Sequence, residues 1–212
     1  MNEILEIVLL SLFVSGTATV IAALIGIPSG IFLSISNFTG KKSVKRVIFT
    51  SMSLPPVVLG LIVLLIISNE GPLGGLNLLF TAKAIIIAQT LLILPIITGN
   101  IITSTEELSV KLIDTVKTLG GKKKDIIKLI MLETKPFIIT AIILGFSRAI
   151  SEVGAVILVG GNIKGSTRVM TGYITLNTSM GNRNESLIMG GILLVIAFIV
   201  NSLLERYRYE NN

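Results

Sequence analysis

The stretch VGGNIKGST, residues 159–167, is close to a nucleotide-binding loop, in which backbone amides hold phosphates and a lysine reaches them. Gly160, Gly165 and Thr167 stand at the required spacing, but Ser166 occupies the position that the lysine must have. The stretch also follows an apolar segment long enough to cross a membrane, whereas a nucleotide-binding loop follows a strand. We therefore predict that these glycines form a turn and that the stretch binds no ATP.

Arg148 and Glu152 are a second group with chemical potential, four residues apart near the middle of the apolar segment 137–159. In a continuous helix this spacing places both side chains on one face. Each charge costs about 2.5–3.5 kcal/mol at the centre of a membrane helix, so such groups usually face a cavity or a partner. The two residues either neutralise each other within the packing, or they form a gate or part of a pathway.

We do not expect a tight anion-binding site at this pair, because Glu152 would repel an anion and largely cancel the charge of Arg148. Ser147 and Ser151 have the same spacing as the pair. Their hydroxyls either line the same face or bond to the backbone of their own helix.

The composition limits the remaining chemistry. The 212 residues include no cysteine, histidine or tryptophan, which excludes disulfides, thiolate or imidazole metal sites, and catalysis by histidine or cysteine. Only 14% of the residues are charged and 51% are hydrophobic, whereas an average soluble domain carries about 25% charged residues. We therefore expect a membrane protein with no metal and no other cofactor of its own.

Apolar segments recur along the whole chain, and each is near or above the ~20 residues that a membrane-crossing helix needs. They cover residues 4–35, 47–67, 84–102, 137–159 and 187–204. The first is too long for a straight crossing, so it must tilt, extend beyond the bilayer, or bend near Gly26, Pro28 and Gly30. The prediction is an all-α, polytopic membrane bundle of about five transmembrane helices, with residues 1–212 forming a single domain.

The distribution of basic residues predicts the orientation of this bundle. Lysine and arginine gather in the connections after the first and third segments and in the C-terminal tail, and few lie in the alternate connections. By the positive-inside rule, the N-terminus is outside and the C-terminus is in the cytoplasm. The net charge of +6 is therefore explained by topology in a cell membrane, with lipid rather than nucleic acid as the surroundings.

The long connection at residues 103–136 is predicted to be cytoplasmic. Apolar residues recur at helical spacing on both sides of Gly120 and Gly121, first at Leu108, Leu112, Val116 and Leu119, then at Ile126, Ile127 and Ile130. This pattern indicates two short amphipathic helices joined at a glycine elbow. The connection is either a linker at the membrane surface or a helix presented to a groove on a cytoplasmic partner.

The outer segment at residues 161–185 is too polar to cross a membrane. Part of it predicts a short surface helix with one apolar face, formed by Val169, Met170, Tyr173, Ile174 and Leu176. That face either packs against the bundle or contacts an external protein.

Part of the connection, DTVKTLGGKKKDIIKLIMLE, resembles the signature loop of ATP-binding cassette (ABC) importer permeases. Asp114 stands where that family has glutamate, and Gly120 has the family spacing. Leu119 and Leu132 also fit, whereas Thr115, Val116 and Glu133 depart from the pattern.

Further stretches extend the resemblance over most of the chain. SLPPVVLGL, at residues 53–61, resembles the molybdate, tungstate and sulfate permeases. Residues 71–99 and 148–174 are similar to the tungstate branch in particular. The chain is thus identified as a member of this group of permeases, and the resemblance implies tungstate as its substrate. Molybdate, sulfate or another small solute are the alternative substrates. A membrane protein outside the ABC class is a weaker interpretation.

The resemblance implies the type I ABC importer permease fold and a homodimer of permeases. It also implies two separate ATPase subunits on the cytoplasmic side and an external oxyanion-binding protein, so that this chain has no ATPase site of its own. The residues that it assigns to ATPase coupling are Asp114, Thr118, Leu119, Gly120 and Gly121. The residues that it assigns to the external turn near the binding protein are Gly160, Gly161, Asn162 and Gly165.

Overall fold

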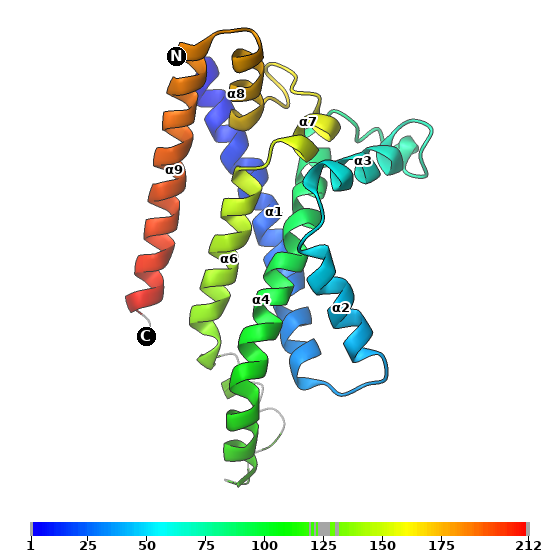
Figure 1. Ribbon diagram of the computed structural model, residues 1–212, viewed down its shortest axis with the longest axis vertical. Helices are drawn as coiled ribbons and strands as arrows, with labels where there is room; N and C mark the ends of the chain where they lie inside the picture. Colours follow the sequence, from blue (N-terminus) through cyan, green and yellow to red (C-terminus); the bar gives the residue numbers. More distant parts are fainter. Residues whose placement is uncertain (1, 119, 121, 123–127, 130–131, 211–212) are drawn as a thin grey trace.

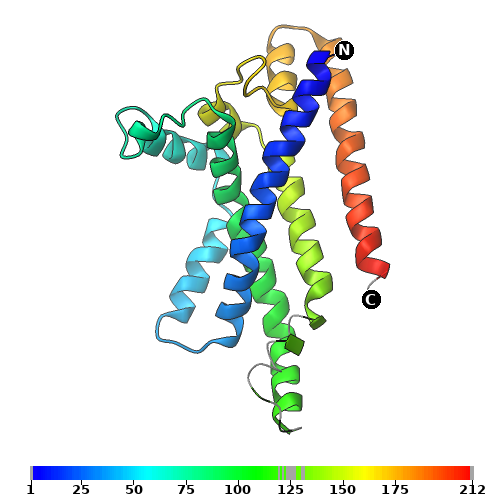
Figure 2. The same ribbon diagram turned by 180° about the vertical axis from the view of Figure 1, so that it is seen from behind.

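The computed structural model describes residues 2–118, 120, 122, 128–129 and 132–210, and all regular structure in these residues is helical. Four long helices run along the long axis of the molecule, as Figure 1 shows: α1 (Asn2–Ile35), α4 (Ala82–Thr118), α6 (Lys135–Ile150) and α9 (Arg183–Glu210). In the view from behind (Figure 2), α1 crosses in front of α4, and α9 lies on the outside of the bundle next to α6.

The centre of the bundle is the contact between α1 and α4, which small residues bring close together. A Cβ atom added at Gly30 would lie 2.8 Å from the Cβ of Ile101, and one added at Gly26 would lie 2.9 Å from Thr98 Oγ1. Side chains at these glycines would therefore separate the helices. The first predicted segment is a single helix in the structure, and it continues through Pro28.

Two of the predicted segments are bent. Helices α2 (Lys41–Ser51) and α3 (Pro56–Ile67) meet at 105°, and α6 meets α7 (Gly154–Gly160) at 59°. Pro55 and Pro56 explain the first bend, because a residue before proline avoids the helical region and Pro56 suits the first position of a new helix. Among the described residues, three helices are long and apolar enough to cross a membrane, or five spans if each bent pair counts as one.

The connection predicted to hold two short helices differs from that prediction in its first half. α4 continues without interruption from the apolar segment to Thr118, so the first amphipathic stretch is the end of a membrane-spanning helix rather than a separate element. The sequence changes from apolar to polar near residue 103, but no proline or glycine stops the helix there. Most of the second stretch, Ile126, Ile127 and Ile130 included, lies outside the described residues.

The two ends of the bundle differ in charge. The connection from α1 to α2, the end of α4, the start of α6 and the end of α9 lie at one end of the molecule (Figure 1). The described lysines and arginines of the predicted cytoplasmic regions are therefore gathered at that end. The N-terminus, α7 and α8 (Met170–Ser179) lie toward the other end, with the short helix η1 (Gly74–Leu76) on the side of α3.

Helix α8 matches the predicted short helix of the outer segment, and it packs against the bundle at its start. Val169 and Met170 are 4% and 0% exposed, and the Met170 amide donates to Ser11 Oγ of α1 at 2.8 Å. The apolar face predicted from the sequence is therefore at least partly buried within this chain.

Candidate functional site

The site with the most unusual chemistry is a break between α6 and α7. α6 ends at Ile150 and α7 begins at Gly154, so Glu152 lies in the break and not on the helical face predicted for it with Arg148. The two residues nevertheless meet, because Arg148 Nη2 lies 3.6 Å from Glu152 Oε2. The predicted pair is therefore present, but a helix terminus rather than a continuous helix positions it.

Glu152 has a structural role on both sides of the break. Its carboxylate accepts a hydrogen bond from the Ala155 amide at 3.2 Å, which caps the start of α7. Its backbone carbonyl accepts a hydrogen bond from Thr171 Oγ1 of α8 at 2.8 Å. The side chain of Glu152 is 4% exposed, whereas that of Arg148 is 39% exposed. Arg148 therefore has the more accessible side chain of the two.

Gln89 of α4 also belongs to this site, although the sequence analysis did not identify it. Its Nε2 donates to the carbonyl of Ala149, in the last turn of α6, at 2.9 Å and to Ser15 Oγ of α1 at 3.3 Å. The residue is 2% exposed, and its Oε1 has no hydrogen-bond partner among the described residues. The signal in the sequence was an amide near the middle of a mostly apolar segment, where a buried polar group needs partners.

The two predicted serines make different hydrogen bonds. Ser151 Oγ donates to the carbonyl of Ser147 at 2.7 Å, which is the backbone-bonded alternative stated from the sequence. Ser147 Oγ donates instead to Asn201 Oδ1 of α9 at 3.0 Å and so joins α6 to the outer helix.

The predicted external turn has the backbone geometry that its glycines suggested. Gly161 and Gly165 have φ angles of 71° and 73°, and Asn162 between them has a φ of 51°. Thr167 Oγ1 closes the turn, because it donates to the carbonyl of Gly160 and accepts from the Ile163 amide. The hydroxyl and the glycines therefore serve the turn, as predicted.

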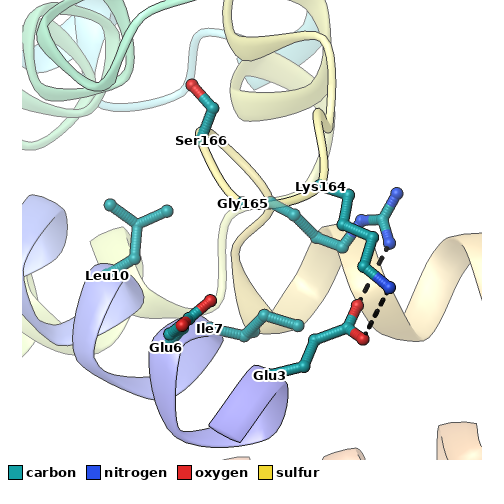
Figure 3. A pocket seen from close by; sticks show the side chains of 8 residues that line it. Glu3, Glu6, Ile7, Leu10, Lys164, Gly165 and Ser166 are labelled. Atoms are coloured by element: carbon teal, nitrogen blue, oxygen red, sulfur yellow. Dashed lines mark ion pairs between the residues drawn. The ribbon is translucent and has the colours of Figure 1, made fainter.

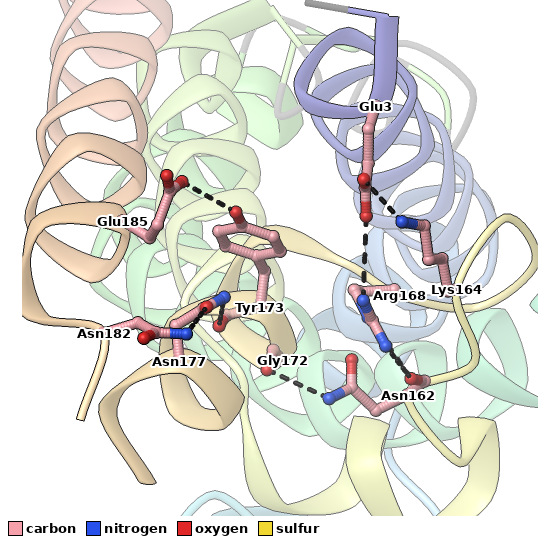
Figure 4. A network of polar contacts seen from close by, with 9 residues as sticks. All are labelled: Glu3, Asn162, Lys164, Arg168, Gly172, Tyr173, Asn177, Asn182 and Glu185. Carbon is pink, nitrogen blue, oxygen red and sulfur yellow. Dashed lines mark hydrogen bonds and ion pairs between the residues drawn. The ribbon is translucent and has the colours of Figure 1, made fainter. Parts of the chain in front are cut away.

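Polar contacts tie this turn to α1 and α8, as Figure 4 shows. Asn162 Nδ2 donates to the carbonyl of Gly172 at 3.0 Å. The carboxylate of Glu3 lies 2.8 Å from Lys164 Nζ and 3.7 Å from Arg168 Nη1. The start of α1 and the turn are thus held together by opposite charges.

A pocket of about 370 Å³ opens beside this ion-pair cluster. Figure 3 shows that its wall combines the first turns of α1 with the external turn, and its lining residues are Glu3, Glu6, Ile7, Leu10, Lys164, Gly165, Ser166 and Arg168. Acidic and basic groups are equal in number here, so the pocket has no strong preference for an anion.

A further hydrogen bond joins α8 to the start of α9. The Tyr173 hydroxyl donates to Glu185 Oε2 at 2.9 Å (Figure 4). This hydrogen bond, together with burial, raises the pKa of Tyr173 above its usual value. The phenol, which is protonated at neutral pH, thus donates a hydrogen bond that joins the two helices.

The predicted coupling residues lie at the opposite end of the bundle. Asp114 and Thr118 belong to the last turns of α4, and Thr118 is its exposed final residue. Gly120 has a φ of 76°, which is the conformation that the glycine elbow requires, and no atom of the described residues lies within 4 Å of its Cβ position. Leu119 and Gly121 lie outside the described residues.

Comparisons with known proteins place nearly the whole chain in one family. The family model described as "Binding-protein-dependent transport system inner membrane component" matches residues 8–207. The tungstate uptake system permease protein TupB of Peptoclostridium acidaminophilum is 44% identical over 208 residues, which cover 98% of this chain and 91% of that protein. The molybdenum transport system permease protein ModB of Escherichia coli is 30% identical over 221 residues, covering 97% and 95%.

A solved structure agrees in fold. A chain of the MetNI methionine ABC transporter in an inward-facing conformation superposes with a TM-score of 0.83, covering 100% of this chain and 97% of that chain, at 15% sequence identity. At this identity the likeness shows the fold alone, which is that of an ABC importer permease. The family match over nearly the full length, the relatives and the fold agree that the chain belongs to the inner-membrane components of binding-protein-dependent transport systems.

Proposed function

We propose that the chain is the membrane-spanning permease subunit of an ABC importer that takes up tungstate. The observation that carries this proposal is the 44% identity, over 98% of the chain, to a tungstate uptake system permease. Molybdate is the alternative substrate, because a molybdenum transport system permease is 30% identical over 97% of the chain. Sulfate and other small solutes are weaker alternatives, since only the resemblance of sequence motifs supports them.

The proposed complex contains two copies of this chain, two ATPase subunits and an oxyanion-binding protein. We assign ATP hydrolysis to the separate ATPase subunits and no cofactor to this chain. The ATPases dock at the end formed by the last turns of α4 and by Gly120, and the binding protein docks at the other end, near the turn at Gly161 and Asn162. The connections that carry most of the lysines and arginines lie at the first end, which supports its assignment to the cytoplasm.

The continuity of α4 gives a physical route for coupling. Thr118, at the predicted ATPase end, and Gln89, at the break between α6 and α7, belong to the same helix, separated by roughly 43 Å of helical rise. ATP drives a conformational change only if the ATPases bind it more tightly in one state of the complex. We call the last turns of α4, together with Gly120, the coupling segment. Its movement then shifts Gln89, and with it the hydrogen bond to the carbonyl of Ala149.

Arg148 is the residue that we assign to the translocation pathway. Its exposed guanidinium meets a passing oxyanion at the break, while the buried carboxylate of Glu152 keeps the local charge near neutral. Binding that is weak in this way suits a permease, because a solute must leave the pathway as readily as it enters. Strong selection among oxyanions is accordingly the task of the binding protein.

Competition for uptake tests the substrate. In cells that produce the chain with its binding protein and ATPase, we expect tungstate to be taken up, and unlabelled tungstate to compete at lower concentrations than molybdate. Cells without this chain serve as the control and should show no such uptake. If molybdate or sulfate competes more strongly than tungstate, that anion is the substrate in place of tungstate. Uptake that persists in cells without the chain would show that the chain is not the permease.

Thiol labelling tests the orientation. Because the chain has no native cysteine, a cysteine introduced at Gly75 or Asn182 can be labelled against a silent background. An impermeant thiol reagent should label both positions in intact cells and should fail to label a cysteine at Lys122, at the opposite end. All three positions are tested again in opened cells as a control, and labelling of Lys122 alone in intact cells would reverse the topology.

A further inference from the structure

A cluster of charges joins three helices at the end of the bundle where the coupling segment begins. Glu106 lies at the end of the apolar part of α4, whose candidate membrane span is Ala82–Glu106. Its carboxylate forms an ion pair with Lys45 and a second one, at 3.6 Å, with Lys41. Both lysines come from α2, one helical turn apart. Glu106 therefore holds α2 against α4 just before α4 continues toward Thr118.

The same cluster includes the end of α1. Lys41 Nζ donates to the carbonyl of Ser34, in the last turn of α1, at 2.9 Å. Ser34 Oγ in turn lies 3.3 Å from the carbonyl of Ile102 in α4. The side chains of Lys41, Lys45 and Glu106 are 20%, 23% and 35% exposed, so the charges are partly shielded from solvent. Such shielding makes an ion pair stronger than one on a fully exposed surface.

The position of α2 depends strongly on these contacts. Among its described residues none is buried, so apolar packing alone does not fix the helix. A second contact with α4 lies seven residues before Glu106, where a Cβ added at Gly99 would lie 2.6 Å from Met52 Sδ. α2 is thus attached to α4 at two levels, through Met52 inside the apolar region and through the lysines at its end.

From α2, contacts lead back to the break that holds Arg148. α2 continues through Pro55 into α3, and α3 packs on α7 so closely that a Cβ added at Gly60 would lie 2.6 Å from Ala155 Cα. The Ala155 amide donates to Glu152, the partner of Arg148. The end of α4 therefore reaches the break by a second route, in addition to the hydrogen bond from Gln89.

We propose that Glu106 is a positioning residue that makes α2 move together with the cytoplasmic end of α4. Through α3 and α7, this shared movement changes the break around Arg148 when the ATPases act on the coupling segment. The proposal rests on the proposed function as an ABC importer permease. It adds a residue that touches neither the solute nor ATP, and it predicts that loss of the charge separates ATP hydrolysis from transport.

The test compares Glu106→Gln and Lys45→Gln in the reconstituted complex with its ATPase and binding protein. Lys42→Gln is the matched control, because Lys42 is exposed on the same helix and makes no ion pair with the described residues. The measurements are the yield of assembled complex, its thermal stability, the ATPase rate, and the tungstate taken up per ATP hydrolysed. We expect both variants to assemble and hydrolyse ATP, with uptake per ATP lowered roughly two- to thirtyfold, as coupling energies of such networks imply.

A charge exchange, Glu106→Lys combined with Lys45→Glu, should restore much of the uptake per ATP. Glu106 would have only a structural role if Glu106→Gln lowered the yield or the thermal stability while uptake per ATP stayed equal to that of the wild type. An equal fall in Lys42→Gln would likewise overturn the proposal, because general surface charge would then explain the effect. A wild-type complex that takes up no oxyanion would instead refute the proposed function itself, and the coupling role with it.

Discussion

Arg148→Gln is expected to leave the permease inserted and assembled but to lower tungstate uptake roughly ten- to hundredfold. The physical reason is that a hydrogen bond from a charged donor to an anion contributes about 1.5–3 kcal/mol. The side chain of Arg148 is 39% exposed and lies 3.6 Å from Glu152, whose buried carboxylate keeps its hydrogen bond from the Ala155 amide when Arg148 is replaced. Uptake by a reconstituted complex, measured beside the thermal stability of the same preparation, checks both parts of this expectation.

Variants of Glu152 provide the matched comparison. Glu152→Leu removes the cap on the Ala155 amide, and loss of such a cap costs about 0.5–2 kcal/mol of stability. Glu152→Gln keeps an oxygen that can accept this hydrogen bond, so it should be more stable than Glu152→Leu. If the pair serves only packing, Arg148→Gln combined with Glu152→Gln should restore both stability and uptake. Full uptake by that double variant would remove Arg148 from the pathway.

Gly120→Ile is expected to abolish uptake while the chain still inserts in the membrane. Gly120 has a φ of 76°, a region in which a β-branched residue is a strong outlier. The turn after α4 must therefore change its conformation, and the surface proposed to contact the ATPase changes with it. The measurements are the amount of complex in the membrane, the stimulation of its ATPase by the loaded binding protein, and uptake. The amount of complex in the membrane should stay normal, whereas stimulation of the ATPase and uptake should be lost.

Gly120→Asn separates the conformation of the turn from the mere presence of a side chain. Asparagine adopts positive φ more readily than other residues with a side chain, and no atom of the described structure lies within 4 Å of the Cβ position. We expect this variant to retain substantially more uptake than Gly120→Ile. Normal uptake by Gly120→Ile would show that the connection is only a linker and plays no part in coupling.

The sequence predicted those parts of the fold that depend on local composition. Long apolar segments located the candidate spans, and the connections that are rich in lysine lie together at one end of the bundle. The break at Glu152 was missed because its stabilising contacts come from distant segments, namely Gln89 of α4 and Thr171 of α8. Spacing within one segment shows that Arg148 and Glu152 can meet, but it does not show that the helix ends between them.

The extent of α4 and the charges at its base illustrate the same limit. The change to polar residues near position 103 predicts a separate connection, but a helix can continue from a membrane into water while its backbone bonds remain internal, as α4 does. Glu106 meets Lys45 across 61 positions of the chain, and no periodicity within a segment reports such a contact. The residues proposed for coupling rest on the family resemblance alone, because an acidic residue such as Asp114 has no distinctive pattern in the sequence around it.

The ratio of tungstate accumulated to ATP hydrolysed, in liposomes that contain the purified permease and its ATPase, tests the central claim most directly. With loaded binding protein on the outer side and ATP on the side of the ATPase, tungstate should accumulate in proportion to the ATP consumed. Omission of ATP, of the ATPase subunits or of the binding protein should each reduce accumulation to the level of empty liposomes. Tungstate accumulation by the permease alone, or ATP hydrolysis without any accumulation by the complete complex, would contradict the account.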